Sequence, residues 1–218
     1  MTDTETPPTV ADASPTHPEQ TPANRPNRLL ELAERFALVV VLVIGLSSAS
    51  KESSKPPAAT TLSANEIAQR LDGAPPALAA LHRQANQILP GARKALRMRL
   101  AALKGHPAVV NIWAAWCGPC RAEMPVMQRV SLDMGKQVAF VGVDLKDNKE
   151  AATTFLAKTP VTYPSYDDPS GQVYNAEKLV GVPSTLFYDK DGKQTFVHQG
   201  PYFDRAALVN DIRQYALG

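Results

Sequence analysis

Apolar runs and amphipathic stretches alternate from Pro107 to the C-terminus. Short runs rich in β-branched and aromatic residues predict strands, and longer stretches with helical spacing predict helices. The predicted strands are residues 109–114, 138–145, 185–189 and 194–198, with a further extended piece at 161–168. The predicted helices are residues 117–134, 147–158 and 172–179, and a final helix that Asp204 caps. This order predicts an α/β domain in which helices flank a central mixed sheet.

Turn residues and apolar spacing support the C-terminal part of this prediction. Residues 190–193 contain Asp-Gly, a strong turn signal, so the last two strands should form a hairpin. The final helix should bury Leu208, Ile212 and Tyr215 against the sheet. Pro125 lies inside the predicted helix 117–134 and should kink it, because proline removes one backbone hydrogen bond.

Residues 64–104 predict a helical extension ahead of a domain at 105–218. Ser63 is a suitable N-cap, and Glu66 three residues later completes a capping box. Gly and Pro clusters predict breaks at residues 73–76 and 90–91. The last helix has an apolar stripe formed by Leu96, Leu100 and Leu103, and a basic opposite face. We interpret it as a helix packed on the domain; the alternative is a surface for anionic lipid or a membrane partner.

The N-terminal part divides by composition into a tail, an apolar segment and a tether. Residues 1–28 are rich in Thr, Pro and acidic residues, which predicts a disordered tail. Residues 29–50 contain the unbroken apolar run 36–46, which predicts a membrane anchor or signal segment. A single-pass signal anchor is the preferred interpretation; a cleaved signal peptide and a buried helix stay open. Residues 51–63 predict a flexible tether.

Charge adds two conclusions. The formal net charge of the 218 residues is +2, which gives no basis for nucleic-acid binding. Arginines 25, 28 and 35 precede the apolar run, so the positive-inside rule favours a cytoplasmic N-terminus. The C-terminal domain would then lie outside the cytoplasm.

The candidate chemistry lies at residues 116–120, which read Trp-Cys-Gly-Pro-Cys. Cys117 and Cys120 are the only cysteines, and they follow a predicted strand at the start of a predicted helix. Residues three apart in a helix share one face, so the two sulfurs can form a disulfide. The helix N-terminus favours a thiolate at the first cysteine. A C-x-x-C pair in this context is typical of a thioredoxin-like redox site.

The stretch VVNIWAAWCGPCRAEMP, residues 109–125, resembles the membrane-anchored thiol–disulfide oxidoreductases of the TlpA/ResA type. A second stretch, Gly181-Val182-Pro183-Ser184-Thr185, precedes the strand at 185–189 and supports the resemblance. The resemblance implies a thioredoxin fold in which a cis Pro183 faces the cysteines. It also implies an exported protein that reduces disulfides in proteins, with apocytochrome c as one substrate.

The resemblance assigns roles to eight residues. Cys117 would attack the substrate disulfide, Cys120 would resolve the mixed disulfide, and Glu123 would tune the thiols and move protons. Gly118-Pro119 matches the dipeptide of reducing thioredoxins. Thioredoxin has an acid where this chain has Asn111, which favours Glu123 for acid–base chemistry. Residues that would contact the substrate are Trp116, Gly118, Pro119, Val182 and Pro183.

We therefore expect an exchange enzyme without a bound cofactor or metal. Its partners would be protein substrates with disulfides, a membrane or periplasmic dithiol electron donor, and the membrane through residues 29–50. Two alternatives stay open. One is a tethered module that binds Cu(I) or Zn at the C-x-x-C pair. The other is a thioredoxin-fold peroxidase, although Ala114 stands where a Thr-x-x-Cys site needs threonine.

Overall fold

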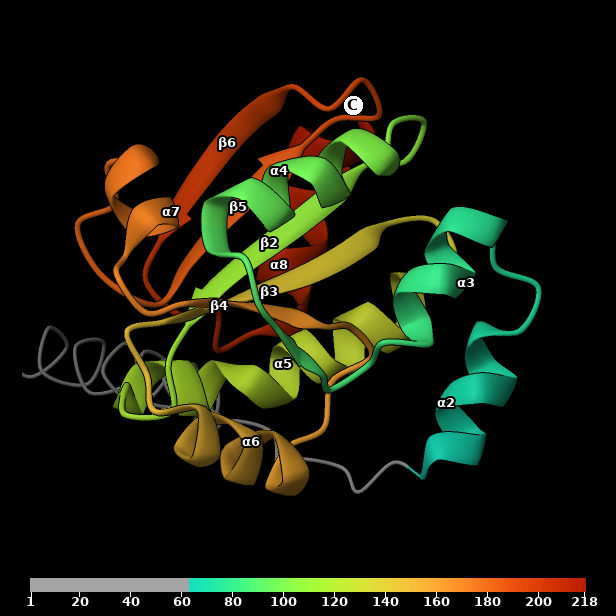
Figure 1. Ribbon diagram of the computed structural model, residues 1–218. Coiled ribbons are helices and arrows are strands. Elements are labelled where there is room, and N and C mark those ends of the chain that lie inside the picture. The colour runs from blue at the N-terminus through green and yellow to red at the C-terminus, as the bar shows by residue number, and fades with distance from the viewer. Residues whose placement is uncertain (1–62) are drawn as a thin grey trace, which may run out of the picture. The chain divides into compact units, whose positions relative to one another are not determined.

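The structure is a computed structural model that describes residues 63–218. A six-stranded mixed sheet lies at its centre, with helices on both faces (Figure 1). The strands are β1 (Ile88–Leu89), β2 (Ala108–Trp113), β3 (Ala139–Leu145), β4 (Ser165–Asp168), β5 (Ser184–Tyr188) and β6 (Gln194–Gln199). Their spatial order is β1-β4-β3-β2-β5-β6. The first four in this order are parallel, and β5 and β6 run antiparallel to their neighbours. The predicted mixed sheet is confirmed.

Seven α-helices and a π-helix surround the sheet in the described part of the chain. They are α2 (Ala64–Leu71), α3 (Pro76–His82), α4 (Ala92–Ala102), α5 (Gly118–Met134), α6 (Lys149–Lys158), α7 (Gln172–Ala176), α8 (Arg205–Asp211) and the π-helix Ile212–Leu217. The predicted tail and apolar segment, and the predicted tether up to residue 62, lie outside the described residues and remain predictions. Within residues 63–218, no helix is both long and apolar enough to span a membrane.

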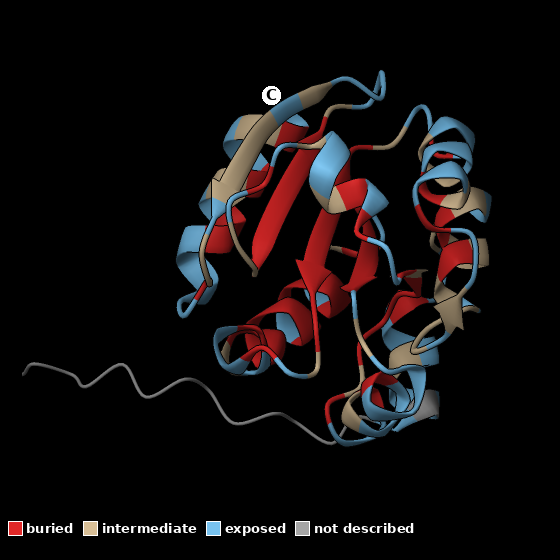
Figure 2. Ribbon diagram, turned by 60° about the vertical axis from the view of Figure 1, so that its left-hand side comes forward, coloured by how far each residue is buried: buried red, intermediate tan, exposed pale blue. Residues whose placement is uncertain are grey.

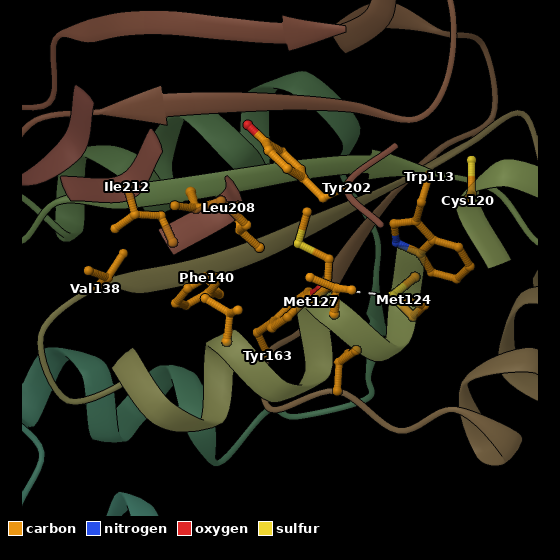
Figure 3. Close-up of a cluster of buried hydrophobic side chains, with 14 of the residues drawn as sticks. Trp113, Cys120, Met124, Met127, Val138, Phe140, Tyr163, Tyr202, Leu208 and Ile212 are labelled. Atoms are coloured by element: carbon orange, nitrogen blue, oxygen red, sulfur yellow. Dashed lines mark hydrogen bonds between the residues drawn. The ribbon is translucent and has the colours of Figure 1, made fainter. Parts of the chain in front are cut away.

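Two apolar cores lie on opposite faces of the sheet. All residues of β2, β3 and β5 are buried, so these strands form the red centre of Figure 2. Figure 3 shows the core that α5 and α8 build with one face, where Trp113, Met127 and Phe140 pack among other large side chains. Side chains of α3, α4 and α7 join the core on the other face. Burial of large apolar side chains is the main favourable term in stability.

The extension at 64–104 differs from an all-helical segment in one place. Its helices begin with the predicted Ser63–Glu66 capping box and are interrupted at both predicted breaks. Between α3 and α4, however, Ile88 and Leu89 form β1, which pairs with β4 at the sheet edge. A strand of two residues is too short to show a period in the sequence. The extension also buries leucines in the second core, so elements on both sides of residue 105 share one interior.

Leu81→Ala tests how firmly the extension belongs to this interior. Leu81 on α3 is fully buried in the core with Leu78 and Leu96. Truncation removes apolar contacts and leaves a cavity, so we expect a loss of about 2–5 kcal/mol in the free energy of unfolding. Urea unfolding measures it. Met98→Ala, at a position 65% exposed on α4, is the control and should change little. An equally small effect for Leu81→Ala would mean that the extension is dispensable.

The C-terminal elements depart from the prediction in detail. The extended piece expected at 161–168 is a strand only from Ser165, and the helix expected at 172–179 ends at Ala176. The final helix continues as a π-helix. Leu208 and Ile212 are buried as predicted, whereas Tyr215 is only half-buried and stacks on Phe196.

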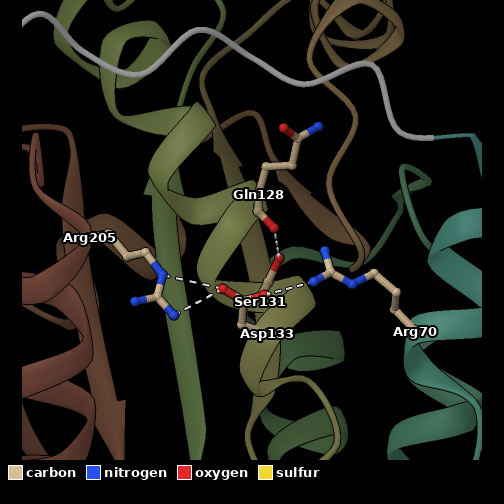
Figure 4. Close-up of polar contacts among 5 residues, drawn as sticks. All are labelled: Arg70, Gln128, Ser131, Asp133 and Arg205. Atoms are coloured by element: carbon tan, nitrogen blue, oxygen red, sulfur yellow. Dashed lines mark hydrogen bonds and ion pairs between the residues drawn. The ribbon is translucent and has the colours of Figure 1, made fainter.

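Ion pairs connect α2 and α8 to the end of α5. Asp133 accepts two hydrogen bonds from Arg205 on α8, and Arg70 on α2 lies 3.6 Å from its other oxygen (Figure 4). Ser131 donates to the carbonyl of Gln128 beside them. Both arginines are half-exposed or more, so each pair contributes at most about 1 kcal/mol. Their effect is to orient α2 rather than to stabilise the fold strongly.

Candidate active site

Cys117 and Cys120 lie where β2 leads into α5. They form a disulfide with a Cα–Cα separation of 5.2 Å. Cys117 is the N-cap of α5, and its sulfur accepts a hydrogen bond of 3.1 Å from the backbone N–H of Cys120. After reduction, the same N–H and the helix dipole would stabilise a thiolate at Cys117. Cys120 is fully buried and Cys117 is 4% exposed, so a partner can reach only Cys117.

The second predicted stretch faces the cysteines. The Val182–Pro183 peptide bond is cis, as the resemblance implied. The carbonyl oxygen of Val182 lies 3.6 Å from the sulfur of Cys117. Residues 65 apart in the sequence therefore meet at one site. An extended peptide that reached Cys117 would lie against the backbone of Val182.

Trp116 is a surface residue beside the disulfide. Its side chain is 57% exposed, and its indole N–H donates to the carbonyl of Lys146 over 3.3 Å. Trp116 is therefore outside the apolar core and open to a partner. Arg121 lies nearby and donates to the carbonyl of Ala115 over 3.2 Å. Both side chains border a surface groove of about 640 Å³ that extends along α6 to Phe155 and Lys158.

Glu123 is buried one helical turn after Cys120. One carboxylate oxygen accepts from the side-chain amide of Asn111 at 2.7 Å, and the other accepts from the backbone N–H of Tyr202 at 3.0 Å. Loss of solvation on burial outweighs these two hydrogen bonds and raises the pKa of Glu123 to about 7. The carboxyl can therefore both take and release a proton near neutral pH. Glu123 is fully buried, so bulk water does not solvate this carboxyl.

A pair of aspartates beside the site was not predicted from the sequence. Asp147 accepts a hydrogen bond from the backbone N–H of Ala115, two residues before Cys117. Asp144 is buried at the end of β3, and burial, together with the charges of Asp147 and Asp167, raises its pKa to about 8. Protonated Asp144 can donate to Asp147, which holds the loop into α5. The only sequence signal was a lone acid at the end of an apolar run.

Asp144→Asn should change how stability depends on pH. The carboxyl has a pKa of about 8 in the folded protein and 3.8 when unfolded. Between pH 3.8 and about 8, the folded protein keeps this proton and the unfolded chain has lost it. The free energy of unfolding therefore falls as pH rises through this window. Asparagine can still donate a hydrogen bond but cannot ionise. The free energy of unfolding of the variant should therefore fall less steeply with pH. Urea unfolding across the window measures it; an unchanged slope would contradict the assignment.

The described residues contain no group of three or more His, Cys, Asp or Glu side chains placed to hold a metal ion. The Cys117–Cys120 pair thus remains the one cluster of sulfur ligands, as the sequence contains no other cysteine.

The sheet order, the helix-capping disulfide and the facing cis-proline define a thioredoxin-like α/β protein. Residues 86–196 match the model described as the AhpC/TSA family, and the chain belongs to this family. The match begins inside the extension, just before β1, in agreement with the shared core.

Individual relatives carry names of thiol–disulfide exchange proteins. The chain is 33% identical over 118 residues to thiol-disulfide oxidoreductase ResA of Oceanobacillus iheyensis, covering 53% of this chain and 62% of that protein. It is 37% identical over 93 residues to thiol:disulfide interchange protein DsbE of Pseudomonas fluorescens biotype C, covering 42% and 51%. These matches span only part of the relatives' length.

A solved structure of a thiol–disulfide exchange protein is also similar to this chain. The crystal structure of a protein assigned as thiol:disulfide interchange protein DsbE from Chlorobium tepidum is similar with a TM-score of 0.50 and 32% identity. The similarity covers 55% of this chain and 85% of that one. The resemblance to the TlpA/ResA-type proteins is confirmed.

Proposed function

We propose that this chain is a thiol–disulfide oxidoreductase that reduces disulfide bonds in proteins outside the cytoplasm. The observation that carries the proposal is the convergence of Cys117 at the N-terminus of α5, the carbonyl of Val182 and the buried Glu123. The names of the relatives support the class of reaction. The Gly118-Pro119 dipeptide supports a reducing direction.

The reaction needs only the two sulfurs and a proton acceptor. The Cys117 thiolate attacks a substrate disulfide, forms a mixed disulfide and releases one substrate thiolate. Glu123 takes the proton of the Cys120 thiol, and the new thiolate attacks the sulfur of Cys117. The mixed disulfide breaks, the second substrate thiolate leaves, and the protein keeps the Cys117–Cys120 disulfide. Two electrons pass to the substrate, and a dithiol donor later returns them to the protein.

Substrate binding would use the surface around Cys117. The backbone at Val182–Pro183 can pair with an extended peptide, a mode that recognises main chain rather than sequence. Exposed Trp116 offers an apolar contact, and Gly118-Pro119 leave room for a partner close to the sulfur. The groove along α6 adds two cations, Arg121 and Lys158, and two acids, Asp147 and Glu150, so it can contact charged side chains of either sign on a substrate.

The cellular setting follows from the resemblance and from residues 1–62. A signal anchor at 29–50 would hold the domain at the cell membrane on its outer side; cleavage would instead release it. A membrane or periplasmic dithiol protein would supply electrons, without a bound cofactor. Reduction of apocytochrome c before haem attachment is the task we favour, because the resemblance to the TlpA/ResA-type proteins implies this substrate.

Catalysed reduction of a disulfide-linked fluorescent peptide, with dithiothreitol as the electron source, tests the proposed reaction. We expect the protein to accelerate reduction far beyond dithiothreitol alone, with turnover proportional to enzyme concentration. Absence of acceleration would overturn the proposal.

The two alternatives make different predictions. A peroxidase would consume hydrogen peroxide with dithiol as the electron source, yet Ala114 lacks the hydroxyl of a Thr-x-x-Cys site. A metal-binding module would copurify with stoichiometric Cu(I) or Zn²⁺ and lose it on oxidation of the cysteines. Peroxide consumption and metal analysis of the reduced protein separate these functions from disulfide exchange.

A further inference from the structure

A row of polar side chains crosses the sheet from Glu123 toward the surface. Asn111 on β2 pairs directly with Thr185 on β5, and Thr185 pairs directly with His198 on β6. Directly paired residues on neighbouring strands have their side chains on the same face, about 5 Å apart. The face is that of α5, because Asn111 donates to Glu123 on this helix. The row therefore connects the buried carboxyl to the sheet edge.

The inner part of the row contains two polar atoms without a partner among the described residues. They are the side-chain oxygen of Asn111 and the hydroxyl of Thr185. Both residues are at most 1% exposed. A buried polar atom without a hydrogen bond costs about 1–3 kcal/mol, so neighbouring examples call for an explanation. Two adjacent unpaired groups are the partners that a buried water molecule needs.

The outer end of the row reaches solvent at His198. Its side chain is 30% exposed, and its Nδ1 lies 3.7 Å from a carboxylate oxygen of Asp211 on α8. Burial lowers the pKa of His198, and Asp211 opposes this effect. The ring stacks on Tyr202 at 4.0 Å, and the Tyr202 hydroxyl donates to the same oxygen of Asp211. Since the backbone N–H of Tyr202 donates to Glu123, one residue contacts both ends of the row.

We propose that Asn111, Thr185 and His198 form the path by which the proton accepted by Glu123 from Cys120 leaves the protein. This inference rests on the proposed function. Once the Cys117–Cys120 disulfide has formed, Glu123 is a neutral acid enclosed by protein. Its proton passes to a water molecule held by the side-chain oxygen of Asn111 and the hydroxyl of Thr185, from this hydroxyl to the ring of His198, and then to solvent. Glu123 returns to the carboxylate, ready for the next cycle, and Asp211 holds the ring in place.

The test separates proton release from disulfide formation. The dithiol protein is mixed with an aromatic disulfide whose thiol products stay ionised. The solution is weakly buffered, and its pH is above the pKa of Glu123. Each reaction then yields two aromatic thiolates, one protein disulfide and the proton of Cys120. Stopped-flow absorbance follows the thiolates, and an indicator dye follows the proton. In the unmodified protein the proton should appear together with the second thiolate.

Thr185→Val and His198→Ala should uncouple the two signals. We expect thiolate release near the normal rate, with the proton delayed on the order of tenfold or more. The matched controls are Thr162→Val, which removes another buried unpaired hydroxyl, and His106→Ala; neither lies in the row. Controls should show no delay. A structural defect would slow thiolate release and proton release equally. Because His198 is partly exposed, its substitution disturbs the fold less than a change at the buried Thr185.

The outcomes distinguish this path from the function on which it rests. Proton and thiolate appearing together in both row variants would overturn the path. Release of the second thiolate at the normal rate in Glu123→Gln would instead remove the acid–base role of Glu123. No thiolate release from the unmodified protein would remove the proposed oxidoreductase function itself.

Discussion

Cys117→Ser should abolish the reduction of disulfide peptides. Of the two cysteine sulfurs, a partner can reach only that of Cys117, and the N–H of Cys120 and the helix dipole act on this atom. A serine hydroxyl at this position cannot form a disulfide with substrate. We therefore expect turnover to fall to the rate of dithiothreitol alone, the largest effect of any single substitution. Residual turnover well above that rate would show that another group starts the reaction.

Cys120→Ser should stop the reaction one step later. Attack by Cys117 remains possible, but no second thiol resolves the product, so a mixed disulfide accumulates. Mass spectrometry after incubation with a disulfide peptide should show one adduct, which a reductant removes. The double variant Cys117→Ser/Cys120→Ser is the matched control and should form none. An adduct on the double variant would mean that the peptide binds without exchange.

Glu123→Gln should slow resolution of the mixed disulfide on the order of 100-fold. The carboxylate must be ionised to accept the Cys120 proton, so the rate in the unmodified protein should rise with pH through about 7. Glutamine keeps the shape: its oxygen can accept from the N–H of Tyr202, and its amide can donate to the oxygen of Asn111 once the Asn111 amide turns over. The variant should lose the inflection near the pKa of Glu123, and rapid-mixing kinetics across pH measures it. An unchanged rate and inflection would assign the base elsewhere.

The same substitution has a consequence for stability with the opposite dependence on pH. The pKa of Glu123 is about 7 in the folded protein against 4.5 in the unfolded chain. Between pH 4.5 and about 7, the folded protein keeps this proton and the unfolded chain has lost it. The free energy of unfolding therefore falls as pH rises through this range. Activity thus rises with pH where stability declines. Glu123→Gln should reduce both the rise in activity with pH and the fall in the free energy of unfolding with pH. One carboxyl would then account for both pH dependences.

Local sequence was sufficient for the residues that carry the exchange chemistry. The C-x-x-C spacing and the strand-to-helix change predicted where Cys117 and Cys120 lie, because three-residue spacing in a helix is a local property. Pro183 and Glu123 came from the resemblance of short motifs. For Glu123, the burial that raises its pKa depends on Tyr202, 79 residues away, and no local pattern contains that information.

Residues beyond these motifs could not be predicted, because their neighbours are set by sheet order. Thr185 and His198 become adjacent only through the β5–β6 register, and Asn111 joins them only because β2 pairs with β5. Asp147 reaches Ala115 through the order of β2 and β3. In the sequence, Ile88 and Leu89 resemble the end of a helical segment. They form a strand because β4 lies beside them and pairs with them.

The reduction potential of the Cys117–Cys120 couple decides whether this protein reduces or oxidises its substrates. The protein would be equilibrated with defined ratios of reduced and oxidised dithiothreitol or glutathione, and the dithiol fraction counted by thiol labelling and mass spectrometry. We expect a potential near that of thioredoxin, about −270 mV, as for a protein that reduces its substrates. A potential near that of a strong oxidant, about −120 mV, would contradict this expectation and make the protein a donor of disulfides.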